Sequence, residues 1–555
     1  MADEPSYNIT ALQRGLRLLQ FFSESPSAKP ARRLRHLVPR AWPLQSESPP
    51  AWGARKTINL GANCYRGKVE SQRRELRPGV LKLVVRHAQI LLRAINLRIG
   101  VMVLAIGCFT ASSSGWASST VTHAPCRVQS TTFEGWKAEE LSNDWVRLTI
   151  VPQLGGRLMQ VTFNSHAYLF VNPKYKGKYF PPSDAAKTGQ WFNYGGDKLW
   201  PLPEGHHDEQ HWAGPISDAL DDGEYKFSIV SQGATCAIRL EGPADSVTGL
   251  QYSREISIGN ESPQISFRAV MKNATGHSIR WSMQSVTQYD TADVRDPVKY
   301  NHDFWAFAPI NPHSAYIDGY RVRDGLADDP SFEVTDGLFT LHWLYLENEV
   351  WLDSDGGWIA IVDNRTEYAM IERFEYVLNA EYPGKASVIF YKNGAALELD
   401  ENGMPTLRSA NWQEAPYYME AEINSPMIDL NPGASYAMDT RWFPTRGDKE
   451  LKAVTSAGIV NRPLAASLTL QGLKVSGVFG VFFPGTLSAH VFDLRGVEIA
   501  VVELQTADPL NEVELNQTVR VADGADRISV HLKDQQGVDR GSLGEAKITK
   551  GKTIS

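Results

Sequence analysis

The residues best suited to chemistry gather in two segments that lie far apart in the sequence. One runs from Trp191 to Trp212 (WFNYGGDKLWPLPEGHHDEQHW) and combines three tryptophans with two adjacent glycines. Indole faces stack on ligand rings, and glycines let the backbone approach a ligand closely, so this segment predicts a ligand-binding loop. The alternative is a structural loop whose tryptophans cover one end of the fold. The candidate ligand-contacting residues of the loop are Asn193, Asp197, Lys198, Trp200 and His206.

The second segment runs from Tyr417 to Asn424 (YYMEAEIN) and carries Glu420 and Glu422. In a strand, side chains two residues apart point to the same face, so these carboxylates are expected roughly 7 Å apart. Paired carboxylates on one face are what general acid–base chemistry on a sugar hydroxyl or a glycosidic oxygen requires. The alternative is that one or both face water or pair with an arginine, such as Arg254 or Arg441.

Two further stretches carry metal-type ligands without a metal-binding spacing. His206 to His211 matches no H-E-x-x-H helix, and Gly205 with the nearby prolines argues against a helical metal face. Asp353 to Gly357 resembles the start of a calcium loop but lacks the later ligands. Exposed turns are favoured at both places, and neither a metal nor a cofactor is predicted.

The elements that must position these residues are predicted to be strands. Runs such as Val146 to Val151, Ile265 to Val270 and Ala386 to Tyr391 alternate or are β-branched, and turn-forming residues separate them. No long stretch has a convincing helical period, and strands without intervening helices cannot form parallel βαβ units. The predicted fold class is therefore all-β, with antiparallel sheets.

Length and strand spacing indicate more than one domain. A chain of 555 residues exceeds a single hydrophobic core. Residues 125–445 are predicted to form one large sandwich, because strands follow one another there without an obvious linker. A boundary near Arg446 separates them from residues 450–549, where about half a dozen strands predict an accessory immunoglobulin-like β-sandwich.

An apolar run from Ile99 to Ala111 has the pattern of a signal peptide. Arginines precede the run and small residues follow it, so residues 93–117 are predicted to direct export and to be cleaved. The run is too short to span a bilayer comfortably, so no membrane span is predicted. A lipid anchor at Cys108 is the second interpretation. The mature protein is expected to be periplasmic or secreted, where Cys126 and Cys236 either pair or remain free.

Residues 1–92 precede this signal and need a separate explanation. Ile9 to Glu24 has apolar residues at helical spacing and resembles the first helix of IclR-type winged-helix regulators. No recognition helix follows, so the hypothesis is that residues 1–92 come from a mis-joined reading frame. No nucleic-acid partner is predicted, and the net charge of -7 gives no overall attraction to one.

The segment Leu148 to Gln160 (LTIVPQLGGRLMQ) resembles the opening strand pair of galactose-mutarotase-like, or aldose 1-epimerase-like, domains. Tyr418 to Trp442 resembles their closing strands, with a carboxylate, a proline and a Pro-Gly turn in order. More narrowly, WFNYGGDKLWP and the ME-AE strand resemble an uncharacterised bacterial family of this superfamily. The resemblance implies a β-supersandwich over residues 125–445 and a carbohydrate ligand.

The resemblance also implies a catalytic base. The carboxylate that acts as base in aldose epimerases lies on the strand that matches Tyr418 to Asn424 of this chain. Glu422, or Glu420 in a shifted register, is therefore the implied base.

The acid of the aldose epimerases has no counterpart here. The first family histidine precedes a Gly-Gly pair, where this chain has Tyr194, and Gln284 and Ser285 occupy the place of the second. Neither amide nor hydroxyl donates a proton at neutral pH as imidazolium does. The residues considered as replacements are Tyr194, Tyr289 and His206, and Arg280 and Gln284 join the implied sugar-binding residues.

The sequence thus predicts an exported carbohydrate-active protein that binds a sugar in a supersandwich cleft. A glutamate base is expected, and the reaction stays open among epimerisation, lysis and hydrolysis. The alternative is a carbohydrate-binding protein without catalysis, which the missing histidines favour. No oligomeric state is predicted.

Overall fold

The computed structural model describes residues 124–182, 190–206, 208–399, 405–407, 411–521 and 523–550. The predicted signal peptide, the Cys108 anchor, the 1–92 extension and His207 lie outside these residues. Within the described ranges no helix is long and apolar enough to cross a membrane. The regular elements are almost all strands, with a short 3-10 helix, η1 (Pro383–Lys385), which confirms the predicted all-β class.

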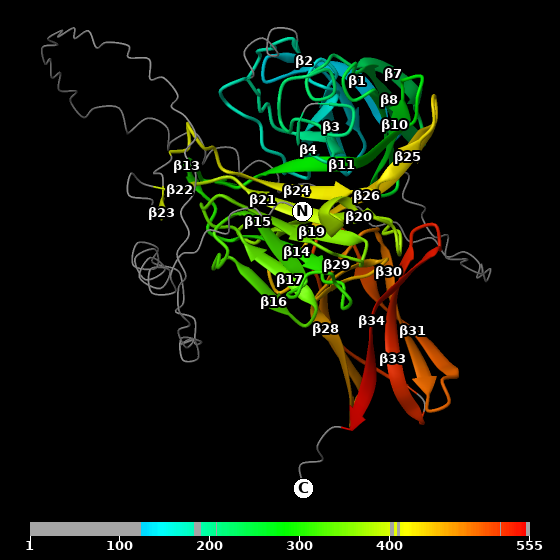
Figure 1. The fold of residues 1–555 in the computed structure, drawn as a ribbon. Coiled ribbons are helices and arrows are strands. Elements are labelled where there is room, and N and C mark those ends of the chain that lie inside the picture. The colour runs from blue at the N-terminus through cyan, green and yellow to red at the C-terminus, as the bar shows by residue number, and fades with distance from the viewer. Residues whose placement is uncertain are drawn as a thin grey trace, which may run out of the picture. The chain divides into compact units, whose positions relative to one another are not determined.

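The first large sheet has twelve strands and carries both chemistry-bearing segments (Figure 1). β5 (His166–Ala167) pairs with β4, and β25 (Ile428–Leu430) pairs with β11. The main path of the sheet runs in this order: β1 (Arg127–Phe133), β2 (Trp136–Ser142), β3 (Val146–Val151), β4 (Arg157–Phe163), β6 (Asp197–Leu202), β11 (Ile279–Asp290), β24 (Tyr418–Asn424), β21 (Val388–Lys392), β18 (Asn348–Leu352) and β15 (Tyr320–Gly325).

The second large sheet has ten strands, and its central strand β26 pairs with β10 and β20. Two small two-stranded sheets, β12 (Ala292–Asp293) with β13 (Asp296–Tyr300) and β22 (Leu397–Leu399) with β23 (Pro405–Leu407), lie off both large sheets. The order of the second sheet is β16 (Phe332–Thr335), β17 (Leu338–His342), β14 (Phe304–Pro309), β19 (Trp358–Asp363), β20 (Tyr368–Phe374), β26 (Ser435–Arg446), β10 (Ile265–Asn273), β9 (Leu250–Gly259), β8 (Thr235–Ala244) and β7 (Lys226–Ser231).

The two large sheets share one hydrophobic core, because strict alternation sends every second side chain inward. In β9 the buried positions alternate with half-buried ones over all ten residues. Met283 and Met419 of the first sheet belong to the same buried cluster as Ile256 and Trp442 of the second. The large sandwich predicted for residues 125–445 is therefore built from two face-to-face sheets.

The third sheet begins after the predicted boundary, since β26 ends at Arg446. β27 (Ala453–Val454) pairs with β28, and Phe482 stacks on Phe443 with ring centroids 4.5 Å apart. An immunoglobulin-like topology for this part stays a prediction. The order of the sheet is β31 (Glu498–Ala507), β30 (Gly485–Asp493), β33 (Ala525–Asp534), β34 (Asp539–Lys550), β28 (Gly458–Thr469), β29 (Gly472–Val481) and β32 (Val513–Val519).

A disulfide joins Cys126 and Cys236, which decides between the two states left open for these cysteines. Their Cα atoms are 5.8 Å apart, and 110 residues separate them in sequence. Cys126 precedes edge strand β1 of the first sheet, whereas Cys236 lies in β8 near the edge of the second. Closing a loop of this length contributes about 5 kcal/mol in the chain-entropy model.

A buried ionic cluster also connects the two sheets. Asp197 of β6 pairs with Arg254 of β9, and the Tyr289 hydroxyl of β11 donates a hydrogen bond of 2.5 Å to Glu372 of β20. Burial raises the pKa of Glu372 to about 8, although the hydrogen bond from Tyr289 opposes this change. The folded protein therefore holds a proton on this carboxyl group at neutral pH.

Glu372→Gln is expected to weaken the pH dependence of stability. In the unfolded chain this carboxyl ionises near pH 4.5, whereas in the folded protein its pKa is about 8. The folded state consequently binds more protons between these values and loses stability as the pH rises through them. In urea unfolding, the wild-type free energy of unfolding should fall relative to the variant by at most ~1.4 kcal/mol per pH unit. A difference that stays constant from about pH 5 to about pH 8 would contradict the assignment.

Candidate functional site

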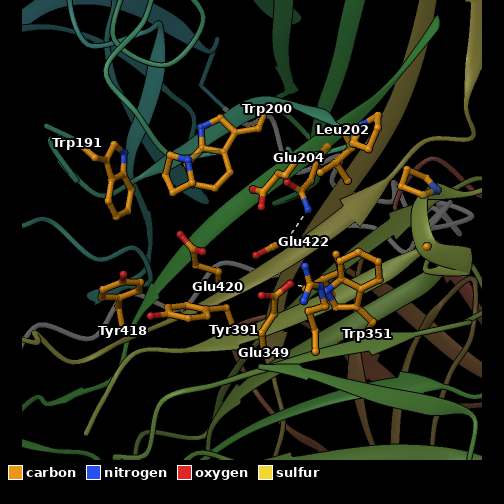
Figure 2. A pocket seen from close by; sticks show the side chains of 17 residues that line it. Trp191, Trp200, Leu202, Glu204, Glu349, Trp351, Tyr391, Tyr418, Glu420 and Glu422 are labelled. Carbon is orange, nitrogen blue, oxygen red and sulfur yellow. Dashed lines mark hydrogen bonds between the residues drawn. The ribbon is translucent and has the colours of Figure 1, made fainter. Parts of the chain in front are cut away.

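Six neighbouring strands of the first sheet, β6, β11, β24, β21, β18 and β15, present side chains to a cavity on the face that points away from the second sheet (Figure 2). Its volume is about 300 Å³, which lies at the lower end of the range for small-molecule sites. This cavity is named the glutamate pocket. It is lined by Trp191, Trp200, Leu202, Pro203, Glu204, Pro215, Gln284, Arg323, Glu349, Trp351, Pro383, Gly384, Ile389, Tyr391, Tyr418, Glu420 and Glu422.

The register of β24 explains why both predicted glutamates reach the pocket. Glu420 lies opposite Gln288 of β11 and Tyr391 of β21, and Glu422 lies opposite Ile389 of β21. Since directly opposed residues share a face, this row of side chains points the same way. Glu420 and Glu422 both line the pocket, so the predicted shared face is present.

Each of these two glutamates is held by an amide. Gln288 donates a 2.5 Å hydrogen bond to Glu420 Oε1, and Lys198 Nζ lies 3.2 Å from the same oxygen. Gln284 donates a 2.5 Å hydrogen bond to Glu422 Oε2. Both glutamates are 6% exposed, so they are removed from bulk water and need such donors. Burial, followed by the charges of neighbouring glutamates, raises the pKa of Glu422 well above its ordinary value.

Two more glutamates complete the acidic lining. The Trp351 indole donates a hydrogen bond to Glu349, and burial raises the pKa of Glu349. Glu204 lies at the exposed rim, and desolvation together with the charges of Glu349 and Glu420 raises its pKa to about 7. The guanidinium of Arg323 opposes both changes. Arg323 falls at an irregularity of the β15–β18 register between Val322 and Asp324.

Aromatic rings form the walls between which these carboxyl groups lie. In Figure 2 Trp200 lies on one side of the glutamates, and Tyr391 and Trp351 lie on the other. Asp221 fixes two of the indoles, because it accepts hydrogen bonds from Trp200 at 2.7 Å and from Trp191 at 3.0 Å. Asp221 in turn pairs with the fully buried Arg157 at 2.7 Å. The indoles are thus positioned before any ligand arrives.

Of the residues predicted from the sequence, the pocket brings together Trp200, Gln284, Glu420 and Glu422. Lys198 lies directly beside them, with its ammonium 3.2 Å from Glu420 and 4.2 Å from the centre of the Trp200 ring. Burial lowers the pKa of Lys198, and the neighbouring Glu420 opposes this. The loop and the glutamate strand, which are far apart in sequence, therefore meet in one site.

Tyr194 does not line the pocket, although it was predicted as a replacement acid. It is fully buried in a separate cluster with Trp136, Tyr175 and Phe192, and its hydroxyl accepts a 3.0 Å hydrogen bond from the Phe180 amide. Burial raises the pKa of Tyr194, and the value is far above neutral. The structure therefore does not bring Tyr194 together with Glu422.

The adjacent glycines have a different role from the one expected. A Cβ on Gly195 would lie 2.2 Å from the Phe170 carbonyl oxygen, and one on Gly196 would lie 2.7 Å from that of Leu158. Both residues also have positive φ angles, which only glycine adopts readily. These glycines let the backbone pass its own neighbouring strands and do not line the pocket.

Four other predicted residues lie outside the pocket lining. Asp197 faces the second sheet, where it pairs with Arg254. The Asn193 side chain accepts a 3.1 Å hydrogen bond from the Gly195 amide. His206 is exposed, and Arg280 pairs on the surface with Glu381 at 2.7 Å. Among the residues that the structure describes, no group of three or more His, Cys, Asp or Glu side chains is arranged to hold a metal ion.

Sequence reasoning missed Glu204, Arg323, Glu349, Trp351 and Tyr391 as site residues. Glu349 and Trp351 alternate with Val350 and Leu352 over residues 348–352, which is the pattern of a half-buried strand. This alternation could have indicated that Glu349 and Trp351 share one face. Arg323 and Glu204 carry no such signal, because a register irregularity and a loop rim place them. These two lining residues could be found only by knowing which strands and loops are neighbours.

No protein-family model matches the chain, and no curated protein matches it. Among solved structures, it is similar to a TPR-domain containing protein from Parabacteroides distasonis, with 17% identity and a TM-score of 0.37 over 56% of this chain and 47% of that one. It is also similar to a galactose mutarotase-like protein from Clostridium acetobutylicum, with 8% identity and a TM-score of 0.36 over 58% and 99% of the two chains. A galactose mutarotase related enzyme from Lactobacillus acidophilus gives 10% identity and a TM-score of 0.34 over 57% and 100%.

Lys198→Met is expected to destabilise the protein by ~3–5 kcal/mol, because it leaves the buried Glu420 carboxylate without its cation. In Lys198→Met/Glu420→Gln no charge is left unpaired, so most of this loss should be recovered. Urea unfolding of the two variants and of wild type gives the three free energies. Equal losses in the single and the double variant would show that the ion pair does not determine stability here.

Proposed function

We propose that residues 125–445 bind a carbohydrate in the glutamate pocket and that Glu422 exchanges a proton with it. The observation that carries this proposal is the row of two buried glutamates within a cavity walled by aromatic rings. Sugars present apolar C–H faces and polar hydroxyl edges. Indole and phenol rings stack on the C–H faces, and carboxylates and amides form hydrogen bonds with the hydroxyl groups.

The environment of Glu422 suits proton transfer. The group is buried and lies near other carboxyl groups, and both effects raise its pKa well above the ordinary value, which favours its protonated form. Glu422 therefore serves first as the acid, which fills the role left open by the missing histidines. Glu420, which accepts hydrogen bonds from Lys198 and Gln288, is the partner that receives a proton.

This pair can carry out the proton transfers common to ring opening and glycosidic cleavage. Both reactions need one group to protonate a leaving oxygen while another removes a proton from a hydroxyl or a water. Adjacent same-face positions of a strand are roughly 7 Å apart, which leaves room for a reacting sugar centre between the two groups. The choice among epimerisation, hydrolysis and lysis then depends on where the sugar ring lies.

A second candidate is sugar binding without catalysis. It is favoured by the absence of histidine among the described residues that line the pocket. The hydrogen bond from Gln284 to Glu422 also gives this carboxyl group a purely structural partner. Under this candidate the four glutamates orient sugar hydroxyls and transfer no proton.

A glycan array followed by product analysis tests the proposal. Wild-type protein is expected to bind a defined set of glycans and to change them, as followed by NMR of anomeric protons and by chromatography. Glu422→Gln keeps the shape of the side chain and should lower turnover by about 10²- to 10⁴-fold, while binding stays within a few-fold.

Glu381→Gln, on the surface and outside the pocket, is the control and should behave as wild type. If wild-type protein binds glycans and leaves them unchanged, the second candidate is correct. Full turnover in Glu422→Gln would remove this residue from the chemistry.

We also propose that the protein is exported and acts in the periplasm or outside the cell. The Cys126–Cys236 disulfide supports this, because such bridges persist in oxidising compartments. Mass spectrometry of the native protein is expected to find an N-terminus near Ser118. A lipid on Cys108 would replace cleavage by an anchored form, and an intact Met1 on the exported protein would contradict the proposed signal.

A further inference from the structure

The glutamate pocket carries more negative than positive groups. Four carboxyl groups line it, from Glu204, Glu349, Glu420 and Glu422, and among the described lining residues Arg323 is the one cation. Lys198 adds a second cation beside Glu420. With Glu422 protonated, as its proposed role as the acid requires, and the other groups ionised, one negative charge remains uncompensated within about 300 Å³.

Several carboxyl oxygens of the lining residues also lack a hydrogen-bond donor among the residues that the structure describes. In the described part of the chain, the hydrogen bonds to Glu420 go to Oε1 and the one to Glu422 goes to Oε2. No described residue donates a hydrogen bond to the other oxygen of either side chain. No described residue donates a hydrogen bond to the Glu204 carboxyl group, which lies with Glu422 and Glu349 in the space between Trp200 and Trp351 (Figure 2).

The pocket wall already binds one ammonium group, that of the protein itself. Lys198 Nζ lies 4.2 Å from the centre of the Trp200 ring and 3.2 Å from Glu420 Oε1. An indole face and a carboxylate together stabilise a desolvated ammonium through cation–π and ionic attraction. Glu204, Glu349 and Trp351 offer the same two kinds of group elsewhere in the lining of the pocket.

We propose that the sugar bound in the glutamate pocket carries a free amino group, so that its ammonium lies beside Glu204 and Glu349. The proposal rests on the proposed carbohydrate function and narrows its ligand class. An N-acetylated sugar would bring a neutral amide into the same place and leave the carboxylates uncompensated. Uronic and other acidic sugars would be repelled.

Matched sugars that differ only at C2 test this inference on the full chain. Isothermal titration calorimetry would compare glucosamine with glucose and N-acetylglucosamine, and galactosamine with galactose and N-acetylgalactosamine. In at least one series, the free amine is expected to bind about 10-fold or more tightly than its two partners, which corresponds to ~1.4 kcal/mol. The preference should weaken in high salt, because it comes from charge attraction.

Glu204→Gln serves as the diagnostic variant, because this residue lies at the exposed rim and its replacement should leave the fold intact. The variant is expected to reduce the affinity for the free amine several-fold more than the affinity for the neutral sugar. Glu381→Gln, outside the pocket, should keep the full preference. Equal losses for amine and neutral sugar would show that Glu204 acts on the sugar generally and would overturn its role as an ammonium ligand.

The two ways of failing can be told apart on a glycan array that includes deacetylated chitosan oligomers. If neutral or N-acetylated glycans bind as well as the deacetylated ones, the ammonium inference is wrong and the carbohydrate proposal stands. If no glycan of any class binds, the carbohydrate proposal itself fails. Selective retention of the deacetylated oligomers would support both.

Discussion

The alternation of side chains along β24 is the constraint on which both the core and the glutamate pocket depend. Every residue of this strand is buried, because one face meets the second sheet and the other lines the pocket. Met419, Ala421 and Ile423 fill the core, whereas Glu420 and Glu422 alternate with them. A shift of register by one residue would exchange the two sets, placing carboxylates in the core and apolar side chains in the pocket. The buried apolar set therefore holds the acidic set in place.

Gathering four glutamates in one cavity has an electrostatic cost that the surrounding residues offset. Gln284 and Gln288 donate to the buried pair, Lys198 neutralises one carboxylate, and the raised pKa of Glu422 favours its uncharged form. Natural proteins keep such destabilising arrangements mainly where a ligand or a reaction uses them. The negative charge that these residues leave uncompensated distinguishes the glutamate pocket from an ordinary buried polar network.

The sequence predicted the parts of this architecture that depend on local pattern. Alternation in YMEAEIN placed Glu420 and Glu422 on one face, and the tryptophan-rich loop predicted Trp200 as a lining residue. What could not be predicted depends on pairing across long distances in the chain, such as β18 beside β21. Tyr194 illustrates the limit of sequence-based prediction. The Gly195-Gly196 pair that follows it was expected at the ligand, but the positive φ angles of these glycines and their close approach to neighbouring strands are seen only in the folded backbone. Arg280 was placed on the correct strand, but toward its exposed end.

The third sheet has a consequence for how the described chain loses its structure. Its buried residues Ile459 and Phe479 belong to the same apolar cluster as Ile371 and Phe443 of the second sheet. Thr445 also donates a 2.8 Å hydrogen bond to the Val481 carbonyl oxygen. Two bodies that share one core cannot melt independently, because opening either exposes the apolar surface of the other to water. The boundary near Arg446 consequently separates two sheets in the sequence, but the parts on its two sides do not unfold independently. The C-terminal strands thus help to support the second sheet, which lies behind the sheet that carries the pocket.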